Sequence, residues 1–172
     1  MAGEVELVRM PWVTLSPLEV NPDDPLTGTV TIKNNTLSSG TKVHVGFLFG
    51  TYDDTTGEFE PYVFTGGTGN EYYHGSLEKN VEVPNKGNTK AVDVKTFAFY
   101  QISEEITFDI LAWVGPNTTL TGTKEYKDSD RRVIGIKKSD FDSYEPYDTT
   151  VYEDQVTIAP ESTVTGFSIA KA

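Results

Sequence analysis

Cysteine is absent from the sequence, which excludes disulfide bridges, thiolate metal sites and cysteine nucleophiles. Histidine occurs only at His44 and His74, whereas a histidine zinc site needs three or four ligands. No apolar run reaches the roughly eighteen residues that identify a membrane-spanning helix. We therefore expect neither zinc catalysis nor membrane insertion, and we expect the chain to depend on packing and association for its stability.

Positive charge is scarce as well. The chain has 14 Lys and Arg against 26 Asp and Glu, a formal net charge of −12, and its isoelectric point is about 4.5. An acidic protein repels the phosphates of nucleic acids and of anionic membranes. We therefore expect protein partners, and we do not expect nucleic acids or anionic membranes as partners.

A secretion signal is not visible in the first fifteen residues. Glu4, Glu6 and Arg9 interrupt the apolar positions, whereas a signal peptide has a continuous apolar segment. This pattern favours a virion over a cell surface as the location, and both locations agree with the remaining sequence features.

Long helix-forming runs are missing, and 15 Gly and 9 Pro suit strands that are joined by turns. The clearest strands lie at 27–35 and 42–52. In the first, Val30 and Ile32 alternate with polar residues, and in the second the apolar residues from Val43 to Phe49 recur at every other position. Because side chains alternate between the two faces of a strand, each run offers one apolar face to a core.

Three later segments carry strand signals. Residues 71–83 are predicted to form two short strands on either side of Gly75. In 89–100 the apolar pattern changes phase, which predicts a bulge near Lys95 or Thr96. The best central strand is 106–114, where Leu111 and Trp113 lie on the face opposite the core. We expect a loop, the tail or another subunit to cover that face.

The sequence therefore predicts an all-β protein, an Ig-like antiparallel β-sandwich with extended N- and C-terminal arms. The expected division is an N-terminal arm at 1–10, the sandwich at 11–136 with an insertion at 53–83, and a C-terminal extension at 137–172. Residues 12–20 are expected to form the first core strand, interrupted at Pro17, and 164–169 a final short strand. The extension has few aliphatic residues before Val151, which sets it apart from the sandwich.

A resemblance to a known family follows from the strand order. The matching stretches are GTVTIKNN at 28–35, VPNKGNTKAVDV at 83–94 and ITFDILAWVG at 106–115. Residues 12–136 resemble the Ig-like modules of bacterial and archaeal surface proteins, in particular the CARDB-like adhesion sandwiches. The resemblance implies a two-sheet sandwich that acts in adhesion or assembly, with no catalytic residues to carry over.

Catalytic and metal motifs are not recognisable. No serine stands in a G-x-S-x-G context, and the loop 66–69 lacks the lysine and the following helix of a phosphate-binding loop. Calcium takes six to eight oxygen ligands, and Asp53, Asp54 and Glu58 are the candidate set. Asp and Thr also favour turns, and the turn is the preferred interpretation. We expect no enzymatic activity and no cofactor, with calcium as the alternative.

Aromatic residues exceed what one small core needs. They suit a protein interface first, a second small core under the insertion next, and a carbohydrate platform last. The interface candidates are Tyr62, Tyr72, Tyr73, Trp113, Phe141, Tyr144, Tyr147 and Tyr152.

Charge is distributed unevenly near the C-terminus. The basic stretch Lys124–Lys138 precedes a segment, 140–161, that carries seven acidic residues, so opposite charges of neighbouring copies could meet. We expect a non-enzymatic structural protein that forms a homo-oligomer or a larger assembly, as a virion subunit (capsid decoration, tail or shell) or a surface filament. Its subunits are expected to join through β-strand and charged-arm contacts, in which an arm adds a strand to the sheet edge of a neighbour. The alternatives are a carbohydrate-binding or adhesion module that uses surface tyrosines, and a hydrolase with two facing carboxylates.

Overall fold

The computed structural model describes residues 3–8, 18–20, 25–65, 69–97, 106–118, 120, 123–128 and 131–158. The elements in chain order are β1 (Val5–Leu7), β2 (Leu18–Val20), β3 (Pro25–Asn34), β4 (Lys42–Asp53), β5 (Glu58–Pro61), β6 (Val63–Thr65), β7 (Glu71–Glu82), β8 (Thr89–Phe97), β9 (Ile106–Pro116), β10 (Thr123–Asp128), β11 (Arg131–Lys137), α1 (Lys138–Asp142) and β12 (Asp148–Ile158).

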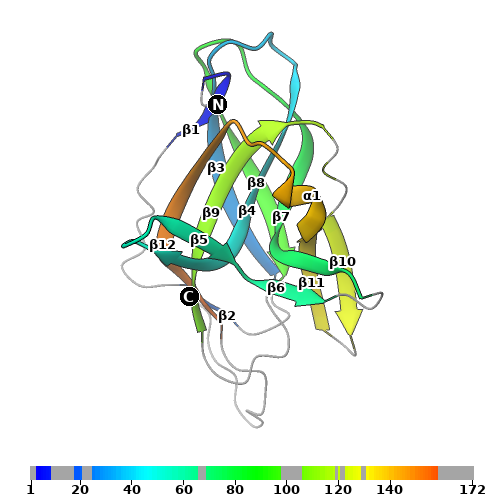
Figure 1. The fold of residues 1–172 in the computed structure, drawn as a ribbon. Coiled ribbons are helices and arrows are strands. Elements are labelled where there is room, and N and C mark those ends of the chain that lie inside the picture. Colours follow the sequence, from blue (N-terminus) through cyan, green and yellow to red (C-terminus); the bar gives the residue numbers. More distant parts are fainter. Residues whose placement is uncertain are drawn as a thin grey trace.

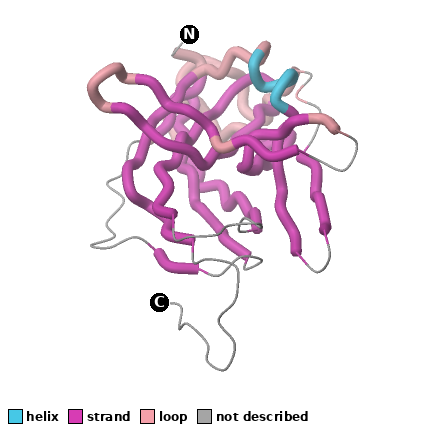
Figure 2. Tube along the Cα trace, turned by 60° about the horizontal axis from the view of Figure 1, so that its bottom comes forward, coloured by secondary structure: helices cyan, strands magenta, loops and turns pink. Residues whose placement is uncertain are grey.

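The strands form two sheets that pack as a sandwich-like fold, which confirms the predicted all-β class (Figure 1). The small sheet has the order β1-β3-β8. The large sheet has the order β10-β11-β7-β4-β9-β12-β2, with β5 added to β4 and β6 added to β7. Among the described pairings, only β12 with β2 is parallel. Strand dominates the whole described chain, and α1 is a single short turn of helix at its surface (Figure 2).

The main core lies between the two sheets, and alternation along the strands supplies it. Val30 and Ile32 of β3 face the even-numbered residues of β9, including Phe108 and Ile110, across the interior. The complete set of buried residues in this core is Val5, Leu7, Val30, Ile32, Val43, Val45, Phe47, Phe49, Val83, Val92, Val94, Phe108, Ile110, Ala112 and Val114.

The strands β3 and β4 follow one another in sequence but belong to opposite sheets. The predicted pattern of a single apolar face describes β3 correctly. In β4 every residue from Val43 to Gly50 is buried, including the intervening His44, Gly46 and Leu48. The reason is that β4 is central in the large sheet and has a second layer on its outer face.

Two details of the predicted strands are wrong. Residues 71–82 form one strand, β7, in which Gly75 is continuous with its neighbours. The pairing of β8 with β3 runs from Phe97 to Thr89 without a register shift, so there is no bulge near Lys95 within the described residues. Irregularities occur elsewhere: in β7 opposite Val43–Val45, where Asn80 has φ 55°, and in β12 between Tyr152 and Val156.

Both arms contribute strands to the chain's own sheets. Val5 and Leu7 of β1 are 0% and 2% exposed, and the Leu7 N–H donates to Asp148 Oδ2 at 2.8 Å. At the other end, β12 lies between β9 and β2 in the large sheet, so the described part of the 137–172 extension is built into the sandwich. The strand predicted at 12–20 is described only at its end, as β2. The strand predicted at 164–169 lies outside the described residues.

A second apolar cluster covers the outer face of the large sheet, as the alternation at Trp113 predicted. Trp113 is fully buried, and its ring centroid lies 5.3 Å from those of both Phe141 and Tyr144. The covering segment is therefore α1 and the turn after it, which belong to the tail of the same chain. The buried members of this cluster are Leu48, Tyr73, Leu77, Trp113, Leu120, Ile136 and Tyr144.

The buried side chain of Asn34 joins two loops at one end of the sandwich. Its Nδ2 donates to the carbonyls of Leu37 and Pro84, both at 2.8 Å, and its Oδ1 accepts from the Leu37 N–H at 3.0 Å. This residue ends β3, and Pro84 follows β7, so the side chain ties the β3–β4 loop to the β7–β8 loop.

Replacing Asn34 by Ala is expected to lower the free energy of unfolding by about 1–3 kcal/mol, because it leaves buried backbone groups without their partners. Urea denaturation followed by fluorescence measures the change. Asn117→Ala, at an exposed position, is the control and should shift stability by less than about 0.5 kcal/mol. Equal effects of the two substitutions would contradict the structural role of Asn34.

Candidate functional site

The aromatic residues that the sequence predicts for an interface are mainly buried or partly buried in the described part of the chain. Tyr72, Tyr73 and Tyr144 are 7–8% exposed, and Trp113 is fully buried. Tyr62, Tyr147 and Tyr152 are partly buried against the main core, and Phe141 is partly buried against the second cluster. The structure therefore uses these rings for packing within the chain, and the surface open to a partner must be sought elsewhere.

A polar contact fixes α1 against β7. Tyr73 Oη donates to Asp142 Oδ1, and Lys138 Nζ donates to Asp142 Oδ2 at 3.0 Å. Burial and the bond to Asp142 raise the pKa of Tyr73 to about 12, and the same bond holds the pKa of Asp142 below its usual value. Near neutral pH, Tyr73 therefore stays neutral while Asp142 and Lys138 stay charged, which suits a structural clamp.

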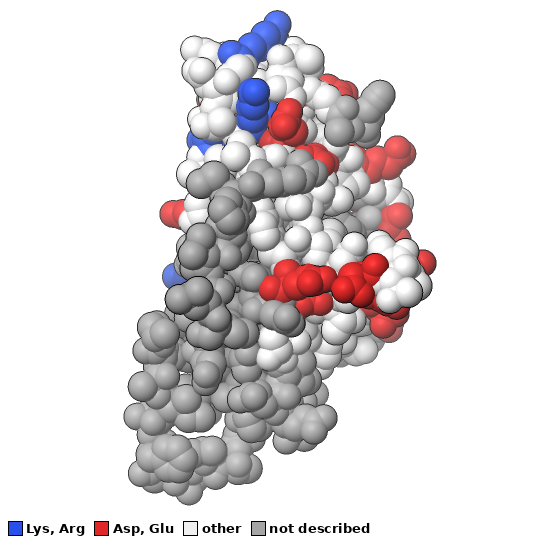
Figure 3. All heavy atoms as spheres, turned by 90° about the vertical axis from the view of Figure 1, so that its left-hand side faces the viewer, with Lys and Arg blue, Asp and Glu red and all other residues white. Residues whose placement is uncertain are grey.

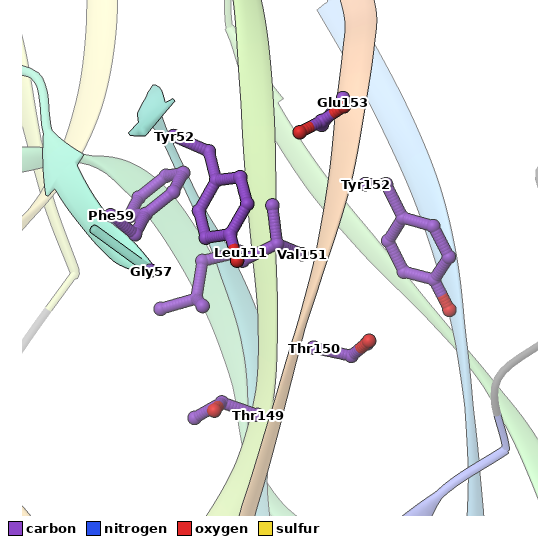
Figure 4. Close-up of a pocket in the computed structure, with 9 residues that line it drawn as sticks. All are labelled: Tyr52, Gly57, Phe59, Leu111, Thr149, Thr150, Val151, Tyr152 and Glu153. Carbon is purple, nitrogen blue, oxygen red and sulfur yellow. The ribbon is translucent and has the colours of Figure 1, made fainter. Parts of the chain in front are cut away.

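The second cluster covers only part of the outer face of the large sheet, and a groove remains beside it. Its floor is formed by Leu111 of β9 and Val151 of β12, which are directly paired across the two strands. One wall is formed by Tyr52 and Phe59, a cross-strand pair in the β4–β5 hairpin. Figure 4 shows the two rings side by side above Leu111 and Val151, with Tyr152 pointing to the other side of β12.

The rim of the groove is acidic. The groove has two adjoining parts of about 580 and 630 Å³, which share Tyr52 and Glu153. In the larger part, Asp53, Glu58 and Glu60 lie on the face of the β4–β5 hairpin opposite Tyr52 and Phe59, because side chains alternate along paired strands. Lys, Arg and His are absent from the described lining of both parts. Figure 3 views the side on which the β4–β5 hairpin projects and shows acidic side chains in a band across it. The carboxylates that line the groove are Asp53, Asp54, Glu58, Glu60, Asp109 and Glu153.

Local features of the sequence explain how the hairpin forms this wall. Gly57 has φ 76°, a conformation that favours glycine and lets the chain reverse between β4 and β5. At Gly50, a Cβ atom would lie 2.8 Å from the Phe59 ring, so only glycine allows β5 to pack so closely. Asp109 Oδ2 accepts the Tyr52 N–H at 2.7 Å and holds the base of the hairpin to β9.

The three calcium candidates lie at the tip of this hairpin, where all are exposed. Asp53 Oδ1 accepts the backbone N–H of Thr55 at 2.9 Å, which is the geometry of a turn-forming aspartate. Within the described part of the chain, no group of three or more His, Cys, Asp or Glu residues has an arrangement that could hold a metal ion. Calcium binding stays the alternative to a turn without a cofactor.

The sequence did not single out four residues of the groove, which are Tyr52, Phe59, Asp109 and Glu153. A signal for Phe59 is present, because one aromatic residue stands between Glu58 and Glu60 in a short polar strand. Asp109 and Glu153 are 44 positions apart and meet only because β12 pairs with β9. No local pattern shows that pairing.

Comparisons with known proteins give no match: no family model, no curated protein and no solved structure is similar to this chain. The resemblance to CARDB-like adhesion modules therefore stays a prediction. In the described residues, no helix is both long enough and apolar enough to cross a membrane.

Proposed function

We propose that this protein is a non-enzymatic structural subunit of a larger protein assembly, such as a virion shell or tail or a surface filament. The observation that carries the proposal is the open groove on the outer face of the large sheet. Its floor and wall expose apolar and aromatic groups beside a polar rim, which is the composition of a protein–protein contact.

The position of the groove supports this function. The tail of the same chain covers the neighbouring part of the same face, where it buries Trp113 beneath Phe141 and Tyr144. Leu111 and Val151 continue that apolar surface beyond the edge of the tail and are only partly buried. A second chain on the groove would extend the cover over them and bury further apolar area, at about 25 cal/mol per Å².

The described arms form strands of the chain's own sheets, with β1 in the small sheet and β12 in the large sheet. We place the contact between subunits in the groove rather than in the arms. Assembly would use the groove and the projecting hairpins of the large sheet. The specific setting, virion or cell surface, belongs to this proposal.

Sedimentation velocity over a concentration series tests the proposal. The wild-type chain of 19.0 kDa is expected to form larger species as its concentration rises. Val151→Lys places a charge on the groove floor and should abolish these species, whereas Thr29→Lys, on the exposed face of the small sheet, should not. Circular dichroism verifies that both variants are folded. A wild-type chain that stays monomeric at every concentration contradicts self-assembly.

A carbohydrate-binding module is the second candidate, and the pair of rings in the groove favours it. Tyr52 and Phe59 lie beside carboxylates that can accept hydrogen bonds from sugar hydroxyls. Tyr72 and Tyr73 are buried and do not offer a platform. Retention of the wild type on a neutral polysaccharide matrix, together with its loss in Phe59→Ala, would support this candidate.

A further inference from the structure

The acidic lining of the groove favours a positively charged binding partner. Four exposed carboxylates line the larger part of the groove, Asp53, Asp54, Glu58 and Glu60, and like charges gathered on one surface repel one another. A cationic segment would relieve this repulsion. The partly buried rings of Tyr52 and Phe59, in the adjoining part of the groove, add contact area that suits the side chains of Lys and Arg.

The chain concentrates its own positive charge in one hairpin. Lys124–Lys138 contains six of the 14 Lys and Arg residues and three acidic residues, which gives a net charge of +3 within a chain of −12. These residues include the strands β10 and β11 and the start of α1. No other stretch of this length in the sequence has a net charge above +2.

This basic hairpin extends from the body of the large sheet. β10 and β11 pair with each other along their whole length, from Thr123 with Ile136 to Asp128 with Arg131. Among the described pairings, only the last three residues of β11 pair with β7. The charged end of the hairpin thus lies past the last residues that anchor it to the sheet (Figure 1).

The basic hairpin and the groove lie at opposite ends of the same sheet. β10 is the first strand in the order of the large sheet, and the groove is formed over β4, β9 and β12 with β5 as its wall. Figure 1 shows β10 and β11 on one side of the molecule and β5 and β12 on the other. The hairpin therefore does not reach the groove of its own chain.

We infer that the groove binds the β10–β11 hairpin of a second copy, so that copies join head to tail. This inference rests on the proposed function and specifies its contact. The two surfaces are different, so the contact is heterologous. An open row of copies therefore has a free groove at one end and a free hairpin at the other. Repetition of the contact produces a filament or a closed ring. The attraction between opposite charges also makes the association sensitive to salt.

Charge reversal of each surface tests the contact by sedimentation velocity. The groove variant is Asp54→Lys with Glu58→Lys, and the hairpin variant is Lys127→Glu with Arg132→Glu. Each is expected to weaken association by at least about tenfold. In an equal mixture, the native hairpin of the groove variant meets the native groove of the hairpin variant, and the two reversed surfaces are complementary to each other, so the mixture should recover the larger species. A chain with all four substitutions should recover the larger species.

The control is Glu78→Lys with Glu82→Lys, two exposed positions on β7 that change the net charge as much as the groove variant does. It should associate as the wild type does, and circular dichroism should show that all variants are folded. If the wild type associates and the charge variants associate equally well, the hairpin–groove contact is overturned while the proposed function stands. A mixture of the two charge variants that stays monomeric also overturns it. A wild type that never associates overturns the proposed function itself.

Discussion

A chain that ends at Lys137 is expected to lose cooperative unfolding altogether. The truncation removes β12, which pairs with β9 at eight residue positions and separates it from β2. The truncation also removes Phe141 and Tyr144, and so exposes Trp113 on the outer face of β9. The whole stability of a domain is only about 5–15 kcal/mol, and these losses together exceed it. Thermal unfolding by circular dichroism and ANS binding measure the outcome.

The matched control is a chain that ends at Ile158, which retains every element that the structure describes. It is expected to unfold in one cooperative transition. A folded, cooperative chain that ends at Lys137 would show that the sandwich is complete without its tail, and would contradict the packing described for β12. The result also matters for studies of assembly, because a truncation at this point would report on unfolding rather than on contacts between subunits.

Tyr144→Ala is expected to lower the free energy of unfolding by about 3–5 kcal/mol, the usual range for removing a large buried aromatic side chain. Tyr144 is 8% exposed, its ring packs on Trp113, and its Oη donates to the Pro116 carbonyl at 2.7 Å. Tyr144→Phe keeps the ring and removes only the hydrogen bond, so it should cost about 0.5–1.5 kcal/mol. Glu145→Ala, at the exposed neighbouring position, should have little effect.

A double-mutant cycle with Gly115 makes this prediction sharper. A Cβ atom at Gly115 would contact the Tyr144 ring, with its Cζ only 2.7 Å away, so Gly115→Ala should cost about 1–3 kcal/mol in the wild type. Removing the ring opens that space, and Gly115→Ala should cost less in a Tyr144→Ala background. Urea denaturation of the four proteins measures the coupling. Additive effects would show that the ring does not lie over Gly115.

The sequence by itself determined the class of fold and much of the main core. Alternation in β3, β4 and β9 predicted which residues face the interior, because side chains on a strand change face at every residue. The same alternation showed that Trp113 needs a cover, since so large an apolar ring is rarely left in water. It did not reveal the length of β7, because Gly75 is a strand breaker by propensity, and in the structure β4 packs directly beside it.

Only the tertiary structure shows which segment covers Trp113 and which part of the outer face of the large sheet that segment leaves uncovered. The segment 137–147 has few aliphatic residues and resembles an appendage, yet Phe141 and Tyr144 complete the second cluster because β11 brings the chain back over β9. The groove likewise depends on long-range pairing. Leu111 and Val151 become its floor only when β12 pairs with β9, and Tyr52 becomes its wall when the β4–β5 hairpin folds beside them. Each contact joins residues that are distant in sequence, so no local pattern encodes it.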